Sequence, residues 1–465
     1  MTSERNTQLS KHPKKPETRN PKPETNHSKL ATRHSALIIF LFSLLIPVSA
    51  TSQPYAQSIV DTLSSTYFAG RGYQDDVDDL AAQFIAGEFE QMGLQPLLED
   101  YEQTFPLVID VFPESSTLFI NGENLRLGID FLPYASSASG NAKNLDRFVQ
   151  GESGLIIPDH NVFQYDVQQL KDAVLVIDET VPASFSQIKD LNQAWLATST
   201  RLDIAARFGA RAVIMLVEND LIYSHPPANA SLPVFMVQKE AWPESIESLS
   251  YSVTAQQDWE TTSSNVIAQI PGTSTADEYL FVTAHYDHLG RIGKDFYFPG
   301  ANDNASGVAL TLELAKYFQQ HPLNHTLVFI GFSGEEQGLR GSRYFVENAP
   351  FSLEQIRFLI NLDMVASGTR GIMALAGSNF PEEFSLLSTI NDSLKLGPLN
   401  KRPNAPNSDH YFFLEKGVSG FFLYTDKGTQ PYHSAADTPD TLEWDDFRAA
   451  YELVRAFLIA LDAEG

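Results

Sequence analysis

The sequence predicts an α/β fold in which helices cover both faces of a mostly parallel mixed sheet, together with an inserted β-rich domain. Two observations carry this prediction. After about residue 262, short apolar runs alternate with segments of helical apolar spacing, which is typical of a largely parallel sheet. Between residues 113 and 261, short β-type runs follow one another with polar turns between them, which is typical of a small domain built mainly from strands.

The first 50 residues differ from the rest and predict an export signal. Residues 1–35 are polar, and residues 36–50 form the apolar run ALIIFLFSLLIPVSA. This run is shorter than the ~20 residues that span a bilayer as a helix. Its last residues, VSA, fit a small-residue cleavage site. We therefore expect a signal peptide that is cleaved after Ala50, and an exported protein that is periplasmic or secreted. The alternative is an uncleaved N-terminal membrane anchor.

Two helices are expected at residues 51–112, before the β-rich insertion. Helical apolar spacing covers residues 55–63 and 78–92, and Gly93 stands where a helix C-cap is expected. The insertion then follows, with β-type runs at residues 116–121, 154–157, 173–177 and 212–217 and one helix at 200–208.

The main domain resumes at residues 262–465. Apolar strands are expected at residues 279–284, 327–332, 358–362 and 420–423. Helices are expected at residues 305–318, 341–348, 384–394 and 444–461. This alternation predicts that both faces of the sheet are covered.

Composition excludes several kinds of chemistry. The chain has no cysteine, so any transition metal would be held by His, Asp and Glu. Residues 1–50 hold eight of the 32 basic and three of the 58 acidic residues, which leaves a formal charge of −31 on the rest. Such a surface disfavours nucleic acid as a partner. A membrane is expected as a partner only if the leader is uncleaved. The sequence also lacks the HExxH, GxSxG and Walker motifs.

Acidic and histidine residues follow the predicted strands of the main domain, in the motifs AHYDH, SGEEQG, NLDM and PYHSAAD. In open α/β sheets, ligand sites form beyond the carboxyl ends of the strands. The side chains expected to meet there are His285, Asp287, Glu335, Glu336, Asp363 and His433. Asp303, in PGANDNASG, adds a carboxylate just before a helix.

Two imidazoles with several carboxylates suit a pair of zinc ions that share a carboxylate and a water. Hydrolysis also needs a carboxylate that is not a ligand. Of the adjacent Glu335 and Glu336, one can bind a metal while the other acts as general base beside the water.

These motifs resemble a known family. HYDH, GANDNASG, FSGEEQGLRGS, NLDM and YHSAADTPD resemble the di-zinc metallopeptidases of the aminopeptidase Y and bacterial secreted leucyl aminopeptidase type, whose superfamily includes glutamate carboxypeptidase and glutaminyl cyclase. The resemblance extends to the opening helices with their AGRGY turn. In the insertion, KDAVLVID, AARFGARAVIMLV and LPVFMV resemble a protease-associated domain, with a generic β-rich insertion as the alternative.

The family resemblance implies a zinc-exopeptidase-like fold with two Zn²⁺ per chain. It makes His285 and Asp363 ligands of one ion, Glu336 and His433 ligands of the other, and Asp303 the bridge.

The same resemblance assigns the catalytic roles. Glu335 becomes the general base, Asp287 orients His285, and Tyr432 polarises the substrate carbonyl. It also implies a cis peptide bond between Asp303 and Asn304.

Further polar residues near these motifs have simpler interpretations. For His288 we expect a structural hydrogen bond rather than a metal ligand. Asp409 either contacts a substrate amine or caps a helix. His321 and His325 flank a Pro turn and are expected to face solvent.

The predicted function is an aminopeptidase that acts on peptides. The strongly acidic chain favours binding of a substrate ammonium group. A carboxypeptidase would instead need a basic side chain in the pocket, and the candidates are Arg340, Arg343, Lys401 and Arg402. A single-zinc glutaminyl cyclase, or an inactive homologue that only binds its partner, would also fit the family resemblance.

Overall fold

The computed structural model describes residues 53–151, 167–178, 201–218, 220–224, 230–368, 370–426 and 431–463. The chain divides into two compact units, Met1–Pro47 and Val48–Gly465. The first unit lies outside the described residues, as do the predicted signal peptide and the strand predicted at residues 154–157. Within the described ranges, no helix is both long enough and apolar enough to cross a membrane.

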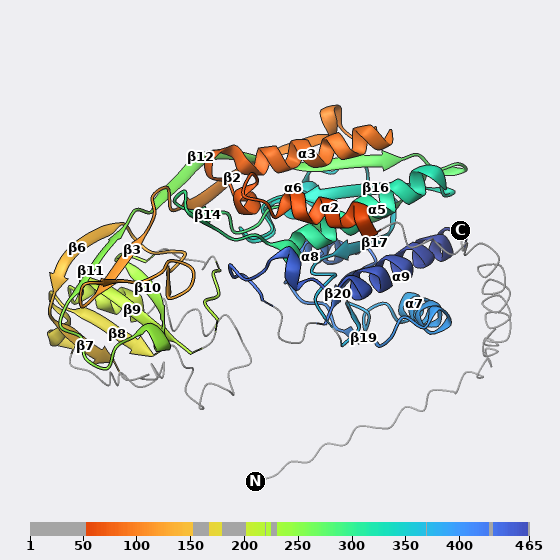
Figure 1. Ribbon diagram of the computed structural model, residues 1–465. Helices are drawn as coiled ribbons and strands as arrows, with labels where there is room; N and C mark the ends of the chain where they lie inside the picture. Colours follow the sequence, from red (N-terminus) through yellow and green to blue (C-terminus); the bar gives the residue numbers. More distant parts are fainter. Residues whose placement is uncertain are drawn as a thin grey trace, which may run out of the picture. The chain divides into compact units, whose positions relative to one another are not determined.

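A nine-stranded mixed sheet forms the core of the main domain (Figure 1). Its four inner strands are parallel: β16 (His325–Phe332), β13 (Thr275–His285), β17 (Ile356–Leu362) and β20 (Gly420–Thr425). These are the four strands that the sequence predicts. Every residue of β16 is buried, because helices cover both faces of the sheet.

The flanking strands of this sheet were not predicted. They are β1 (Gln95–Pro96), β2 (Glu102–Val111), β12 (Gln256–Ile270), β18 (Ile372–Leu375) and β19 (Leu399–Arg402). Strand β12 pairs antiparallel with β2 and β16, and β18 pairs antiparallel with β20, so the sheet is mixed. The predicted domain boundary at residues 261 and 262 falls inside β12, whose polar, Thr- and Ser-rich middle looks like a linker in the sequence.

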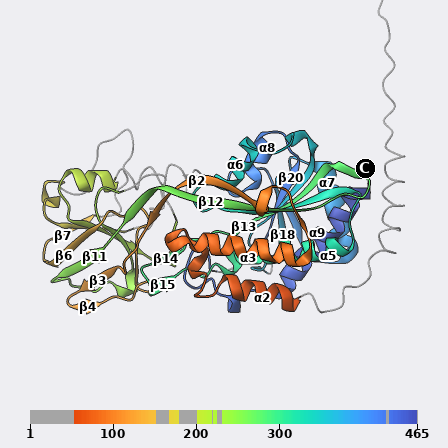
Figure 2. The same ribbon diagram turned by 90° about the horizontal axis from the view of Figure 1, so that it is seen from above.

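Helices cover both faces of this sheet, as predicted (Figure 2). One face carries α2 (Gln53–Leu63), α3 (Val77–Met92), α5 (Gly307–Gln320) and α9 (Trp444–Ala463). The other face carries α6 (Arg340–Glu347) and α8 (His410–Glu415), and α7 (Pro381–Leu394) packs on α9. Gly93 ends α3 in the left-handed conformation, as the C-cap prediction requires.

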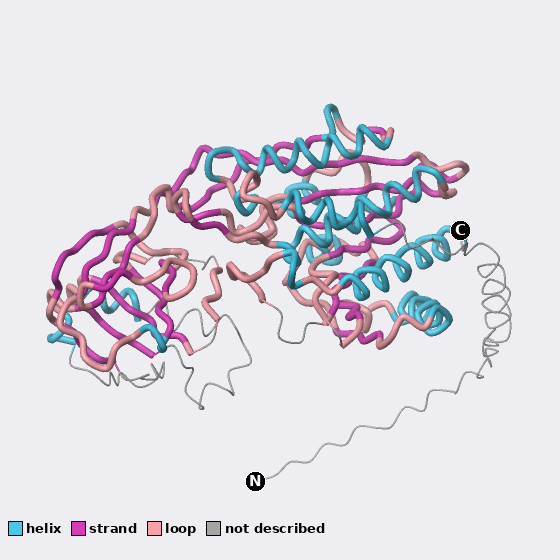
Figure 3. Tube along the Cα trace, in the orientation of Figure 1, coloured by secondary structure: helices cyan, strands magenta, loops and turns pink. Residues whose placement is uncertain are grey.

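Two smaller sheets lie between β2 and β12 in the sequence, and strands are the main regular elements among the described residues there (Figure 3). The five-stranded sheet contains β5 (Phe131–Pro133), β10 (Val234–Gln238), β9 (Ala212–Val217), β8 (Val174–Asp178) and β7 (Phe148–Gly151). The four-stranded sheet contains β4 (Glu123–Asn124), β3 (Thr117–Ile120), β11 (Leu249–Val253) and β6 (Gly140–Leu145). We call this region, residues 113–253, the β-rich region.

The β-rich region shares a hydrophobic core with the main domain. Leu289, Ile292 and Phe298, which follow β13, pack in the same cluster as the β-rich strands. They lie in and beside the short hairpin of β14 (Arg291–Ile292) and β15 (Phe296–Tyr297). The segment after β13 therefore reaches both the β-rich region and the carboxyl edge of the main sheet, where the predicted site lies.

Candidate metal centre

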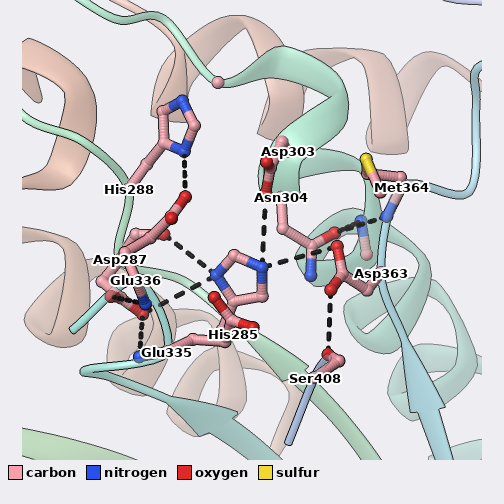
Figure 4. A network of polar contacts seen from close by, with 12 residues as sticks. His285, Asp287, His288, Asp303, Asn304, Glu335, Glu336, Asp363, Met364 and Ser408 are labelled. Atoms are coloured by element: carbon pink, nitrogen blue, oxygen red, sulfur yellow. Dashed lines mark hydrogen bonds and ion pairs between the residues drawn. The ribbon is translucent and has the colours of Figure 1, made fainter. Parts of the chain in front are cut away.

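Three predicted site residues meet beyond the ends of β13 and β17. His285 is the last residue of β13, Asp363 follows β17, and Asp303 lies in η7 (Ala301–Ser306), just before α5. The Nε2 atom of His285 lies 3.3 Å from Oδ1 of Asp303 and 3.4 Å from Oδ1 of Asp363. These three side chains are buried and could hold one metal ion (Figure 4).

A second group of side chains faces the other oxygen of Asp303. The Nε2 atom of His433 lies 3.2 Å from Oδ2 of Asp303 and 3.3 Å from Oε2 of Glu336. Asp303 thus turns one carboxylate oxygen toward each of two imidazoles, His285 and His433. A carboxylate in this position can bridge two metal ions.

His288 is a further imidazole beside this second group, and His288, Asp303 and Glu336 could also hold an ion. Its Nδ1 atom lies 2.8 Å from Oε1 of Glu336, so it forms the hydrogen bond that we expected. His433 faces the other oxygen, Oε2. His288 and His433 therefore contact different oxygens of Glu336, and we assign His288 to the orientation of that carboxylate.

The charges of this buried cluster favour a cation. Burial lowers the pKa of His285, but the carboxylates of Asp363 and Glu335 outweigh it and raise this pKa well above its ordinary value. Burial likewise opposes ionisation of Asp303, yet hydrogen bonds to His285 and His433 hold its pKa well below the usual range. The buried carboxylates therefore favour positive charge at both imidazoles, which metal ions bound at the same atoms would supply.

One buried oxygen of Asp363 is also suited to bind a metal. The Oδ2 atom of this residue accepts a hydrogen bond of 2.9 Å from the hydroxyl of Ser408. Its Oδ1 atom, which faces His285, has no hydrogen-bond partner among the described residues. A buried carboxylate oxygen without a partner is costly, which fits a metal-binding position.

Asp287 organises the loop that carries the two glutamates, which lies between β16 and α6. Its carboxylate accepts hydrogen bonds of 3.2 Å from the backbone N–H groups of both Glu335 and Glu336. The hydroxyl of Tyr73 donates to the same carboxylate over 2.6 Å. The Nδ1 atom of His285 lies 3.1 Å from the backbone carbonyl of Asp287 and 3.7 Å from its carboxylate. Asp287 thus touches His285 mainly through its backbone.

The peptide bond between Asp303 and Asn304 is cis, as the family resemblance implies. The surrounding backbone is held by polar side chains. Asp437 accepts hydrogen bonds from the N–H groups of Asn302 and Asp303, at 2.9 and 3.0 Å. The amide of Asn304 donates to the carbonyl of Leu362. These contacts fix Asp303 between the segments after β17 and β20.

Glu335, the predicted base, lies beside the candidate metal ligands. Burial raises the pKa of Glu335 well above its ordinary value; His285 opposes this, and the carboxylates of Glu336 and Asp363 add to it. Tyr432 stacks on His433, with ring centroids 3.8 Å apart and planes 18° apart. Burial raises the pKa of Tyr432 well above its ordinary value, so its hydroxyl keeps its proton at neutral pH.

Asp409 precedes α8 but does not cap it, since its side chain makes no cap hydrogen bond. The capping interpretation is therefore wrong, and the side chain is instead fully buried. Burial raises the pKa of Asp409 to about 7, against the influence of His285 and Ser342. The charge of Asp409 in turn helps to raise the pKa of Glu335.

Arg71 is a site residue that the sequence analysis missed. Its guanidinium is fully buried and donates hydrogen bonds to backbone carbonyls of Leu63, Tyr286, Pro299, Gly300 and Asp303. Burial lowers the pKa of Arg71 to about 10, and Asp303, Asp437 and other nearby carboxylates oppose this effect. Arg71 and Tyr73 both belong to the AGRGY turn, which was the only sequence sign of their importance.

This α/β sheet, with paired imidazoles and carboxylates at its carboxyl edge, defines a class of metal-dependent hydrolases. Within that class, residues 265–458 match the model of Peptidase family M28, and this part of the chain is a domain of that family. The resemblance of the main-domain motifs to a zinc metallopeptidase family is thereby confirmed, whereas the resemblance of the insertion to a protease-associated domain stays a prediction.

The curated relatives of this chain include an aminopeptidase and probable zinc metalloproteases. Aminopeptidase YwaD of Bacillus subtilis is 28% identical over 268 residues, which cover 53% of this chain and 56% of that protein. A probable zinc metalloprotease of Pyrenophora tritici-repentis is 38% identical over 104 residues, which cover 22% of this chain and 24% of the relative. The chain thus spans about half, or less, of the curated relatives it matches.

Solved structures share the fold. A zinc aminopeptidase from Bacillus subtilis, BSAP, superposes with a TM-score of 0.65 and 22% identity, over 87% of this chain and 93% of that one. A Peptidase M28 precursor from Shewanella amazonensis superposes with a TM-score of 0.68 and 18% identity, over 92% of this chain and 97% of that one. The predicted fold class is confirmed by these likenesses.

Proposed function

We propose that this protein is an exported di-zinc aminopeptidase, which hydrolyses the N-terminal peptide bond of peptides. One observation carries the proposal: Asp303 turns one carboxylate oxygen toward His285 and the other toward His433, at 3.3 and 3.2 Å. This arrangement suits a carboxylate that bridges two metal ions. Zinc is the metal named in several of the relatives.

The donor set fits two zinc ions. His285 and Asp363 would hold one, Glu336 and His433 the other, and Asp303 would bind both. These are nitrogen and carboxylate ligands of the kind that catalytic zinc uses, and none is a thiolate. Bound zinc would polarise the substrate carbonyl and lower the pKa of water, which is the chemistry that the protein alone does not supply.

Side chains of the protein itself accept and donate the protons of the reaction. Glu335 receives a proton from the attacking water and passes it to the leaving amine. Its raised pKa suits this exchange, because the group can hold a proton near neutral pH. The protonated hydroxyl of Tyr432 donates toward the oxygen on which negative charge develops.

Preference for the N-terminus rests on the environments of the basic residues that could bind a substrate carboxylate. Arg340, Arg343, Lys401 and Arg402, the candidates for binding a substrate carboxylate, are all exposed. Arg343 pairs with Glu347, and the ammonium group of Lys401 lies over the ring of Phe384. The guanidinium of Arg71 is closer to the site but is occupied by backbone carbonyls. The surroundings therefore favour a substrate ammonium group over a carboxylate.

The test uses one short peptide in free, N-acetylated and C-amidated forms, with free amino acids measured over time. Acetylation should abolish release, whereas amidation should leave it. Cleavage of the acetylated form and loss of cleavage on amidation would make the protein a carboxypeptidase. Conversion of an N-terminal Gln to a cyclic product without peptide cleavage would make it a cyclase.

A further inference from the structure

A short segment of the β-rich region, residues 220–224, reaches the loop that carries His433. The N–H group of Tyr223 donates a hydrogen bond of 2.9 Å to the backbone carbonyl of His433. The hydroxyl oxygen of Ser224 lies 2.9 Å from Nδ1 of the His433 ring. Two consecutive residues therefore hold both the backbone and the side chain of one candidate zinc ligand.

This segment is anchored in the core of the β-rich region. Leu221 and Tyr223 are exposed by only 5% and 2%, and both belong to the hydrophobic cluster that the β-rich strands build. The ring of Tyr223 packs against Phe298, with centroids 4.9 Å apart. The position of Ser224 is thus set by the packing of the β-rich region on the segment after β13.

The contact with Ser224 decides which ring nitrogen of His433 faces the metal position. When the Ser224 oxygen accepts the Nδ1 proton, Nε2 keeps its lone pair, and Nε2 is the atom that lies near Asp303 and Glu336. Partners of this kind fix the tautomer and the ring orientation of a metal-binding histidine. His433 also has a φ of 49°, a conformation uncommon for residues other than glycine, so its backbone needs such support.

The other candidate ligands are held by the main domain itself. The Nδ1 atom of His285 contacts the carbonyl of Asp287, and Asp363 accepts a hydrogen bond from Ser408. Glu336 contacts His288 through Oε1. Within the described ranges, His433 is the ligand whose ring partner comes from the β-rich region.

We propose that Ser224 is a positioning residue for His433, and that the β-rich region thereby completes the second zinc site. The proposal rests on the two-zinc site of the proposed function. It gives the β-rich region a part in metal binding, in addition to any contact with substrate. Zinc at the first site, held by His285 and Asp363, should not depend on Ser224.

The test measures zinc affinity directly, by competition with a chromogenic chelator, in wild type and in the Ser224→Ala variant. We expect one of the two zinc ions to bind about 10- to 100-fold more weakly in this variant, the usual effect of losing such a partner. Ser224→Thr keeps the hydroxyl and should restore the affinity. The control is Ser252→Ala in β11, an exposed serine of the same region, which should bind zinc as wild type does.

A double variant shows which ion is affected. Because His433→Ala removes the ligand itself, adding Ser224→Ala to it should weaken zinc binding no further. Wild-type affinity for both ions in Ser224→Ala, or an additive effect in the double variant, would overturn the proposal. If wild type itself binds fewer than two zinc ions, the two-zinc site of the proposed function is what fails.

Discussion

The hydroxyl of Tyr73 lies 2.6 Å from Oδ2 of Asp287, and the same hydroxyl accepts a hydrogen bond of 3.0 Å from the N–H group of Gly334. Tyr73 therefore joins the segment after α2 to the loop that carries Glu335 and Glu336. Asp287 in turn holds the N–H groups of both glutamates. A single buried hydroxyl thus supports the position of the proposed base and of a proposed zinc ligand.

Replacing Tyr73 by Phe should lower kcat while the protein keeps its zinc. The variant removes the hydrogen bond to the charged Asp287, worth about 1.5–3 kcal/mol, together with the bond from Gly334, and keeps the ring in its place. If the whole of this energy stabilises the transition state, its loss lowers kcat by roughly 10- to 100-fold. The measurement is steady-state kinetics on a free peptide, with zinc content determined on the same samples. Tyr67→Phe, an exposed tyrosine, is the control. An unchanged kcat would show that Asp287 holds the loop without Tyr73.

Replacing Glu335 by Gln should remove the base and leave the ligands intact. Turnover should fall by about 10²- to 10⁴-fold, the usual contribution of a general base, with two zinc ions still bound. Activity and metal content are measured together. The matched variant is Glu336→Gln, which should lose zinc. If Glu335→Gln loses the metal and Glu336→Gln keeps it, the roles of the two residues are reversed.

The protein should bind two zinc ions per chain. Asp303→Asn should weaken the binding of both ions. Asp303 faces both imidazoles, so a neutral amide at this position loses charge at each ion. Asp363→Asn, by contrast, should weaken the binding only of the ion that Asp363 would hold together with His285. Metal analysis after dialysis against graded chelator concentrations distinguishes these cases. Full activity with a single ion would contradict the two-zinc site and favour the single-zinc cyclase.

The four inner strands were predicted because each is a continuous apolar run, which is how a strand buried on both faces is recognised. The site residues were predicted for a related reason: they follow the ends of those strands, and parallel strands end at one edge of the sheet. Strands β12 and β19 were missed because most of their residues are polar, and β18 because its apolar run, IMAL, is only four residues long. Without them the sequence predicted a mixed sheet but did not show which strands run antiparallel.

The sequence assigned no role to two supporting residues of the site, Tyr73 and Ser224, although Tyr73 lies in the AGRGY turn. Tyr73 and its partner Asp287 are separated by 214 positions in the sequence, and Ser224 and His433 by 209. Neither pair has a spacing that secondary structure would reveal.

For His325 the prediction from the sequence was wrong. It was expected to face solvent, as exposed His321 does, but it is buried and contacts Asp462 of α9 over 2.7 Å. The Pro turn gives no sign that α9 folds over the start of β16, because that contact joins segments 137 positions apart.

Asp78, buried near the site in α3, should make the stability of the protein depend on pH. Its carboxylate accepts a hydrogen bond of 2.6 Å from the hydroxyl of Ser263 in β12. Burial raises the pKa of Asp78 to about 7; the bond from Ser263 opposes this, and the charges of Asp79 and Asp287 add to it. A free Asp titrates near 3.8. Between these two pH values the folded protein therefore binds more protons than the unfolded chain.

Because the folded state holds the extra proton, the contribution of Asp78 to stability falls as pH rises from about 4 to about 7. Above pH 7 the carboxylate is charged in both states, and its burial then costs at most about 4 kcal/mol. Asp78→Asn removes this charge and keeps an oxygen that can accept from Ser263. The variant should therefore unfold at a higher temperature than wild type at pH 8, and the difference should shrink toward pH 5.

The difference in unfolding temperature between Asp78→Asn and wild type is measured by thermal unfolding with saturating zinc, at several pH values between 5 and 8.5. Zinc release at low pH affects both proteins alike, so the comparison isolates Asp78. The control is Asp79→Asn, at the next position of the same helix. Asp79 is exposed, so water screens its charge, and this control should change the unfolding temperature less than Asp78→Asn does at pH 8. A constant difference between Asp78→Asn and wild type across the whole pH range would show that Asp78 does not titrate there.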